Sequence, residues 1–242
     1  MIEAVTFDYW GTLYYESPDA DEREARRVEY ARSFLMGLGH DVSAEVLRVG
    51  QEVLGRQMAH HRLSTHRGLN AEDTGSMLAE IVGVRLAGGE ARRLGELLSA
   101  AGREMPPTLA AGAADVLRAL HGRVKLAVIS DTGVTLSHDM YAVMEADGIA
   151  GLFDHFTFSD QTGTTKPEQR QFSHTLYRLG CPPSAAVHVG DFESADIAGA
   201  KAIGMRAIRI RNHWDDPATT ADAAVETISE VLPVLQAWGL AV

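Results

Sequence analysis

The chain has 242 residues, of which 45% are hydrophobic and 23% charged, which is enough apolar material for a sizeable folded core. Its formal net charge of -11 at pH 7 argues against nucleic acid and anionic membrane surfaces as partners. Cys181 is the single cysteine, so an intrachain disulfide is excluded. Because the sequence also shows neither a signal-peptide pattern nor a membrane-spanning apolar run, we expect a cytoplasmic protein.

Short apolar runs alternate with helical patterns along most of the chain. Such runs are typical of strands that are buried on both faces, and their alternation with helices predicts a parallel sheet with right-handed crossovers. The predicted strands are Ile2–Phe7, Val124–Ile129, His155–Phe158, Ala186–Val189 and Met205–Ile210. The predicted helices of this part are Gly112–Leu120, Leu136–Asp147, Glu168–Leu179, Ser194–Ile203 and Ser229–Trp238.

Residues 19–105 differ, because they show helical patterns throughout and no strand pattern. The predicted helices are Asp21–Leu38, Ser43–His60, Asn70–Val84 and Gly89–Ala101, with Asp21, Ser43 and Asn70 as N-caps and Gly39 as a helix stop. Pro106 and Pro107 mark the return to the sheet. We therefore expect a Rossmann-like α/β core of residues 1–18 and 106–242, with an α-helical cap of residues 19–105 inserted after the first strand.

Two polar motifs follow the first two predicted strands, and in open parallel sheets ligands bind outside the carboxyl ends of strands. Asp8 lies directly after the first strand, and Gly11 would let the chain turn sharply there. Ser130 and Asp131 follow the second strand, where a hydroxyl ahead of a helix can hold an anion. The ordinary alternatives are an aspartate that caps a turn and a simple helix cap.

Two further motifs lie later in the chain. Lys166 precedes Pro167 ahead of a helix, where its ammonium could neutralise both Asp8 and a phosphoryl oxygen, although most lysines are solvated surface residues. An apolar strand then ends in Gly190 and Asp191, and Asp196 falls inside the next helix. With Asp8, these acids form an oxygen-rich set of the kind that magnesium takes. The alternative is a helix N-terminus that favours acidic residues.

These four motifs, in this order, resemble the haloacid dehalogenase superfamily, and the helical insert lies where that family places its type-one cap. The resemblance implies a magnesium-dependent hydrolase, most simply a phosphatase acting on a small phosphorylated metabolite. Asp8 would attack phosphorus and form an aspartyl-phosphate, while Ser130 and Lys166 would hold phosphoryl oxygens.

The same resemblance implies a ligand set. Mg²⁺ would be held by Asp8, the backbone carbonyl of Trp10 and Asp191, and Asp196 would support the metal or orient Lys166. Thr12 and Asp131 are the further candidates for substrate contact. The expected partner is therefore a small phosphorylated molecule, on a protein that is a monomer or a homodimer.

Trp10 departs from the family pattern. Family phosphatases usually carry an aspartate there, which protonates the leaving oxygen and then activates water, and an indole can do neither. Either the leaving group needs little protonation, or another residue substitutes, or halide leaves as in 2-haloacid dehalogenases, or the protein binds a phosphorylated ligand with little turnover. Dehalogenases of the family carry an aromatic residue at this position, but Gly190, Asp191 and Asp131 favour phosphatase chemistry over dehalogenation.

The stretch from Arg56 to Arg67 contains no acidic residue, although the chain is strongly acidic. It covers the end of a predicted helix and the loop that follows, where cap residues could face the site. We predict that Arg62 and His61 contact the anionic part of the substrate or supply the missing proton. The alternative is that basic residues simply favour a helix C-terminus.

Overall fold

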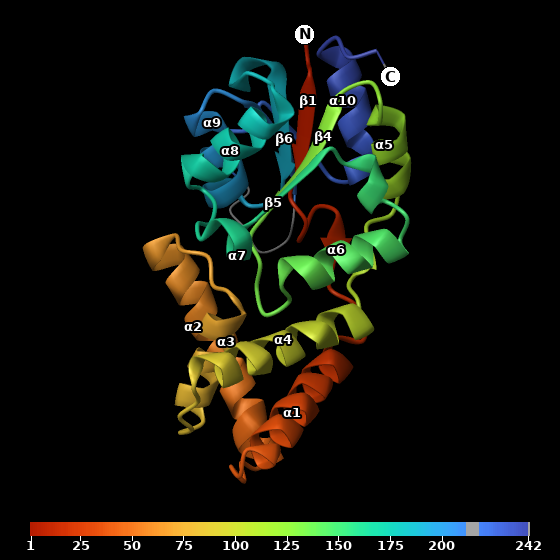
Figure 1. The fold of residues 1–242 in the computed structure, drawn as a ribbon. Helices are drawn as coiled ribbons and strands as arrows, with labels where there is room; N and C mark the ends of the chain where they lie inside the picture. The colour runs from red at the N-terminus through yellow and green to blue at the C-terminus, as the bar shows by residue number, and fades with distance from the viewer. Residues whose placement is uncertain (212–217, 242) are drawn as a thin grey trace.

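A computed structural model describes residues 1–211 and 218–241 (Figure 1). In these residues six parallel strands form one sheet in the order β5-β4-β1-β6-β7-β8. The strands are β1 (Ala4–Phe7), β4 (Lys125–Ser130), β5 (His155–Phe158), β6 (Ala186–Gly190), β7 (Arg206–Ile210) and β8 (Ala223–Val225). The α/β fold with a parallel sheet is thereby confirmed, and β8 is an edge strand that the sequence pattern did not indicate.

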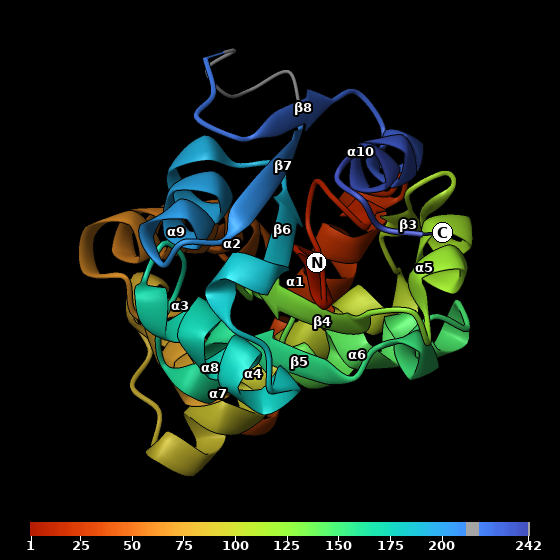
Figure 2. The same ribbon diagram turned by 90° about the horizontal axis from the view of Figure 1, so that it is seen from above.

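Helices cover both faces of the sheet, as Figures 1 and 2 show. One face carries α5 (Ala113–Leu120), α6 (Ser137–Ala146) and α10 (Val231–Ala237), and the other carries α8 (Gln169–Leu179) and α9 (Ala198–Ala202). Phe7, Leu117 and Val231 belong to the core on the first face, whereas Ile129 and Phe172 belong to the core on the second. The strands are apolar at nearly every position because both of their faces are buried.

The centre of the sheet is the point where the strand order reverses. β1 pairs with β4 on one side and with β6 on the other, so that Phe7 lies in register with both Val128 and Val189. From there the chain builds β5 outward beside β4, and β7 and β8 outward beside β6. Such a switch point opens a crevice at the carboxyl ends of the central strands, which is where α/β proteins bind their ligands.

Helices α1 (Ala20–Gly37), α2 (Ala44–Thr65), α3 (Ala71–Ile81) and α4 (Gly88–Glu104) lie beyond the carboxyl ends of the strands (Figure 1). Leu35, Leu54, Leu78 and Leu94 form a buried core between them. The chain leaves and returns through an antiparallel ribbon of β2 (Tyr14–Tyr15) and β3 (Thr108–Leu109), whose two-residue strands are too short to give a sequence pattern. That residues 19–105 are a separate cap domain stays a prediction. Among helices of the described residues, none is long and apolar enough to cross a membrane.

The helix caps follow the sequence at most of the predicted positions. The Ser43 hydroxyl accepts a hydrogen bond from the main chain of Val46, and Asn70 caps α3 through two main-chain N–H groups. Gly39 follows α1 with a φ of +88° and ends it. The prediction for Asp21 was wrong, since α1 begins at Ala20 and Asp21 lies in its first turn. There a carboxylate interacts favourably with the helix dipole without capping the end.

Two helices differ most from their predicted extents. α2 continues past His60 to Thr65, because no residue breaks it and the Ser64 and Thr65 hydroxyls donate to the carbonyls of His60 and His61 at 2.8 Å. His61 and Arg62 therefore lie on the helix and not in a loop. The helix predicted from Ser194 begins instead as a π-helical turn, Glu193–Ile197, which continues into α9.

A buried carboxylate on α6, paired with a half-exposed arginine on α4, joins the two helices. Asp139 on α6 is fully buried and accepts hydrogen bonds from Ser99 Oγ at 2.5 Å and from Arg103 Nη1 at 2.6 Å, both on α4. Because α4 belongs to the helical insert and α6 covers the sheet, this carboxylate helps to set how the insert is placed over the strand ends.

We predict that Asp139→Ala lowers the free energy of unfolding by about 1–3 kcal/mol, because it leaves the Ser99 hydroxyl and the Arg103 guanidinium without their acceptor. Chemical denaturation measures the change. Asp115→Ala is the control, since its exposed ion pair with Arg118 should contribute less than about 1 kcal/mol. Equal losses in the two variants would contradict the prediction.

Candidate active site

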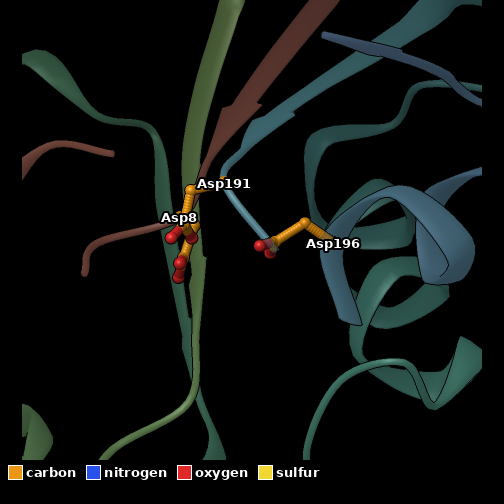
Figure 3. A group of neighbouring side chains, drawn as sticks. All are labelled: Asp8, Asp191 and Asp196. Atoms are coloured by element: carbon orange, nitrogen blue, oxygen red, sulfur yellow. The ribbon is translucent and has the colours of Figure 1, made fainter. Parts of the chain in front are cut away.

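Three buried carboxylates meet at the carboxyl ends of the central strands. Asp8 follows β1, Asp191 follows β6, and Asp196 lies in the π-helical turn beyond it, and Figure 3 shows their side chains gathered around one space. Each residue is at most 7% exposed. One carboxylate oxygen from each lies within 4.8 Å of the others. This all-oxygen donor set fits a hard divalent cation such as Mg²⁺.

Lys166 lies among these acids, on the loop before α8. Its Nζ is 2.6 Å from Asp8 Oδ1 and 2.6 Å from Asp196 Oδ1, and the side chain is buried, so it is not a solvated surface lysine. Burial acts to lower the pKa of Lys166. The carboxylates of Asp196, Asp8 and Asp131 raise it by a larger amount, so the net pKa is above its usual range. The ammonium therefore remains charged in the site.

The pKa values of the two carboxylates that flank this ammonium are shifted in opposite directions. Burial raises the pKa of Asp8, and the nearby Lys166 only partly offsets that effect. Burial also acts to raise the pKa of Asp196, but Lys166 and His188 outweigh it, and the net pKa lies below the ordinary range. Asp196 is thus a fixed counter-charge for the lysine, while Asp8 faces the open part of the site.

The end of β4 supplies a hydroxyl and a further acid. Ser130 lies beside Asp8 on the cavity wall. Asp131 Oδ1 accepts a hydrogen bond from the main-chain N–H of Lys166 at 2.9 Å, and Asp131 Oδ2 lies 3.9 Å from Nη1 of Arg62 on α2. Burial raises the pKa of Asp131 to about 6, against the lowering effect of Lys166.

These residues line one cavity of about 430 Å³. The sequence-predicted residues on its wall are Asp8, Trp10, Arg62, Ser130, Asp131, Lys166, Asp191 and Asp196. A second cavity of about 290 Å³ adjoins it between α2 and the loop after β4, and Trp10, Arg62 and Asp131 line both. Thr12 is fully buried and His61 lies on α2, and neither lines these cavities.

Gly11 occupies a position that no other residue fits. Its φ is +72°, and a Cβ built there would lie 2.3 Å from Asp191 Oδ2. The turn predicted at this glycine therefore has two functions, since it reverses the chain after Asp8 and leaves space for the Asp191 carboxylate.

Two polar residues within the strands support the site, and the sequence motifs did not indicate their role. His188 on β6 is fully buried, with Nε2 3.2 Å from Asp196 Oδ1 and Nδ1 2.8 Å from Thr6 Oγ1. Arg209 on β7 is buried and donates from Nε to the main-chain oxygen of Asp191 at 3.1 Å. The available signal was a polar side chain inside an otherwise apolar strand, which must find a partner when buried.

Comparison with known proteins decides the family. The sequence model of the haloacid dehalogenase-like hydrolase family matches residues 2–204. The chain belongs to this hydrolase family. A ribulose-1,5-bisphosphate 5-phosphatase from Halopiger xanaduensis is 30% identical, covering 96% of this chain and 98% of that protein. A glyceraldehyde 3-phosphate phosphatase from Methanopyrus kandleri is 31% identical, covering 87% of this chain and 84% of that protein.

Solved structures of the family share the fold of this hydrolase. A phosphatase of the haloacid dehalogenase family from Thermococcus onnurineus aligns with a TM-score of 0.69 at 24% identity, covering 97% of this chain and 98% of that one. A 2-haloacid dehalogenase from Pseudomonas syringae pv. tomato aligns with a TM-score of 0.68 at 25% identity, covering 99% of this chain and 100% of that one. The fold is therefore common to both activities, and the site residues must distinguish them.

We predict that Gly11→Ala lowers hydrolytic activity at least about tenfold and lowers the free energy of unfolding by about 1–2 kcal/mol. The added Cβ displaces the Asp191 carboxylate, and the left-handed backbone is unfavourable for alanine. Steady-state kinetics and denaturation measure the two effects. Gly151→Ala is the matched control, because its Cβ would meet no atom within 4 Å, and a loss of similar size there would contradict the explanation.

Proposed function

We propose that this hydrolase is a magnesium-dependent phosphatase that acts on a small phosphorylated metabolite through an aspartyl-phosphate on Asp8. The observation that carries the proposal is the Asp8 carboxylate at the end of β1, 2.6 Å from the buried Lys166 ammonium and beside the Asp191 carboxylate. A nucleophilic carboxylate, a fixed cation and oxygen ligands for a metal are the parts that phosphoryl transfer needs.

The donor set indicates which residues would hold the cation. Asp8, Asp191 and the backbone carbonyl of Trp10 offer oxygens at the strand ends. Both oxygens of Asp196 already accept hydrogen bonds, one from Lys166 Nζ at 2.6 Å and one from the main chain of Phe192 at 3.0 Å, so we assign Asp196 to holding the lysine. When bound, Mg²⁺ supplies positive charge that brings a phosphate to an otherwise acidic cavity.

The chain's own residues account for the two displacements. An Asp8 oxygen attacks phosphorus, the bond from phosphorus to the leaving oxygen breaks, and an acyl phosphate forms on Asp8. Water then attacks the same phosphorus, which releases phosphate and restores the carboxylate. The Lys166 ammonium and the Ser130 hydroxyl bind the non-bridging oxygens as negative charge shifts between them. Because these groups are buried and already in place, little reorganisation accompanies the reaction.

The cavities favour a compact substrate. The reacting phosphate occupies the 430 Å³ cavity, and the remainder of the molecule extends into the adjoining 290 Å³ cavity past Arg62. We propose a phosphorylated sugar or a metabolite of similar size, in agreement with the names of the relatives, whose substrates are ribulose bisphosphate and glyceraldehyde 3-phosphate. Arg62, and not His61, is the proposed contact from α2, because His61 lines neither cavity.

A 2-haloacid dehalogenase is the second candidate, and Trp10 favours it because halide leaves without a proton. Against it, Asp191 lines the cavity together with Asp8, and its carboxylate repels a departing halide ion. The same carboxylates suit a metal-dependent phosphatase. A protein that binds a phosphorylated ligand with little turnover is the third possibility, and activity measurements distinguish it from both enzymes.

We predict that Asp8→Asn lowers phosphate release more than about a thousandfold, because the amide lacks the nucleophilic oxygen. We also expect that EDTA abolishes phosphate release by the unchanged protein and that Mg²⁺ restores it. Both are measured with p-nitrophenyl phosphate, glyceraldehyde 3-phosphate and ribulose 1,5-bisphosphate as substrates. Asp115→Asn, on the exposed face of α5, serves as the control and should retain activity.

Each other outcome identifies a different function. Release of chloride from 2-chloropropionate in the presence of EDTA would establish the dehalogenase and contradict the phosphatase. Absence of turnover on both substrate classes would indicate a protein that binds a phosphorylated ligand without hydrolysing it. Full phosphatase activity in Asp8→Asn would remove Asp8 from the mechanism altogether.

We predict that Arg62→Ala raises KM for the phosphorylated sugars about ten- to a hundredfold, since it removes one hydrogen-bonding charge from the substrate site. Steady-state kinetics measure this effect. Arg56→Ala is the control, because Arg56 lies on the same helix but lines neither cavity. If both variants shift KM equally, a general loss of positive charge on α2 explains the effect and direct contact does not.

A further inference from the structure

Trp10 cannot transfer a proton, and another buried acid lines the same cavities. We propose that Asp131 is the catalytic acid and base of this enzyme, which protonates the leaving oxygen and then accepts a proton from the attacking water. The inference rests on the proposed phosphatase function and adds a residue to its mechanism.

Asp131 lies where the two cavities adjoin. Asp131 and Trp10 both line the 430 Å³ cavity and the adjoining 290 Å³ cavity, so the two residues lie where one cavity passes into the other. An in-line leaving group departs away from Asp8, and a substrate whose remainder occupies the adjoining cavity extends past Asp131 and Trp10. The leaving oxygen therefore passes the Asp131 carboxyl group.

The Asp131 carboxylate has an incomplete set of hydrogen bonds. Asp131 is 6% exposed, and the Lys166 main-chain N–H fixes its Oδ1. Its Oδ2 is buried and accepts no hydrogen bond from the described residues, and Arg62 Nη1, at 3.9 Å, is beyond hydrogen-bonding distance. A buried carboxylate oxygen without a donor is unfavourable, whereas a protonated Oδ2 could donate to an oxygen of the substrate.

The electrostatic surroundings of Asp131 also suit an acid and base. Burial raises the pKa of Asp131 to about 6, with Lys166 and Arg62 opposing the effect and Asp8 adding to it. A bound phosphate adds negative charge that acts to raise this pKa, and a cation held by Asp8 and Asp191 would act to lower it. With a pKa of about 6, Asp131 can both give and accept a proton near neutral pH, as a group that acts first as an acid and then as a base must.

Asp131 loses one proton in the first displacement and regains one in the second. As the bond from phosphorus to the leaving oxygen breaks, the Asp131 proton moves to that oxygen, and an alcohol departs while Asp131 becomes a carboxylate. Water then attacks phosphorus and gives one proton to Asp131 Oδ2 as the bond to Asp8 breaks. Phosphate leaves, and Asp131 is again protonated for the next substrate.

The test compares leaving groups in Asp131→Asn. Asparagine keeps the volume and can still accept the Lys166 N–H bond, but it cannot transfer the proton. For glyceraldehyde 3-phosphate and ribulose 1,5-bisphosphate, whose leaving groups are alkoxides, we expect kcat/KM to fall about a hundred- to ten-thousandfold. For p-nitrophenyl phosphate, whose phenolate departs without a proton, the loss should be much smaller. The ratio of kcat/KM for the sugar phosphates to kcat/KM for p-nitrophenyl phosphate therefore falls by about a hundredfold or more.

Asp160→Asn is the matched control, because this acid bonds Ser137 and lines neither cavity, and it should leave the ratio unchanged. Equal losses on all substrates in Asp131→Asn would overturn the inference, since they are what a purely structural role through Lys166 predicts. Unchanged protein that hydrolyses p-nitrophenyl phosphate but neither sugar phosphate would also overturn it. Lack of phosphate release from all three substrates would contradict the proposed function itself, and the role of Asp131 with it.

Discussion

The buried ammonium of Lys166 is the interaction on which the site depends. Asp8, Asp131, Asp191 and Asp196 are all less than 8% exposed, and carboxylates held this close together repel one another strongly in a medium of low dielectric constant. Lys166 offsets this repulsion in two ways, because its Nζ contacts Asp8 and Asp196 while its main-chain N–H donates to Asp131. Without the lysine, the sheet would bring acids together that could not remain ionised.

The rigidity of the site comes from the interior of the sheet. His188 on β6 contacts the Asp196 carboxylate, and its other ring nitrogen contacts Thr6 on the neighbouring strand β1. Arg209 on β7 donates a hydrogen bond to the main-chain oxygen of Asp191. These polar groups are buried and partnered, so Asp196 and the main chain of Asp191 are held by side chains from inside the sheet. The parallel register therefore determines the distance between Asp8 and Asp191 as well as the fold.

The sequence predicted the parts whose cause is local or periodic. The apolar runs predicted the central strands, and the position of Asp8, Ser130, Lys166 and Asp191 after them predicted a shared site, because parallel strands end at one edge. The β2–β3 ribbon could not be predicted, since two-residue strands carry no periodicity. The sequence also could not predict which of His61 and Arg62 lines the cavity, because that depends on how α2 is rotated about its axis where it passes the strand ends. The contacts of Arg209 join distant segments of the chain, and local patterns do not show such pairings.

Trp10 and Asp131 are best understood as one linked feature. Trp10 is half-buried, contacts Tyr9 edge to face with ring centroids 5.0 Å apart, and lines the same cavities as Asp131. An acid at both positions would place two carboxylates on one passage with Lys166 already occupied by Asp8 and Asp196, and mutual repulsion would disfavour that arrangement. With the indole after β1, these cavities have an apolar group beside the buried carboxyl group at the end of β4. The tryptophan takes the place of one proton-transfer group, and the proposed one lies on the neighbouring strand end of the same cavities.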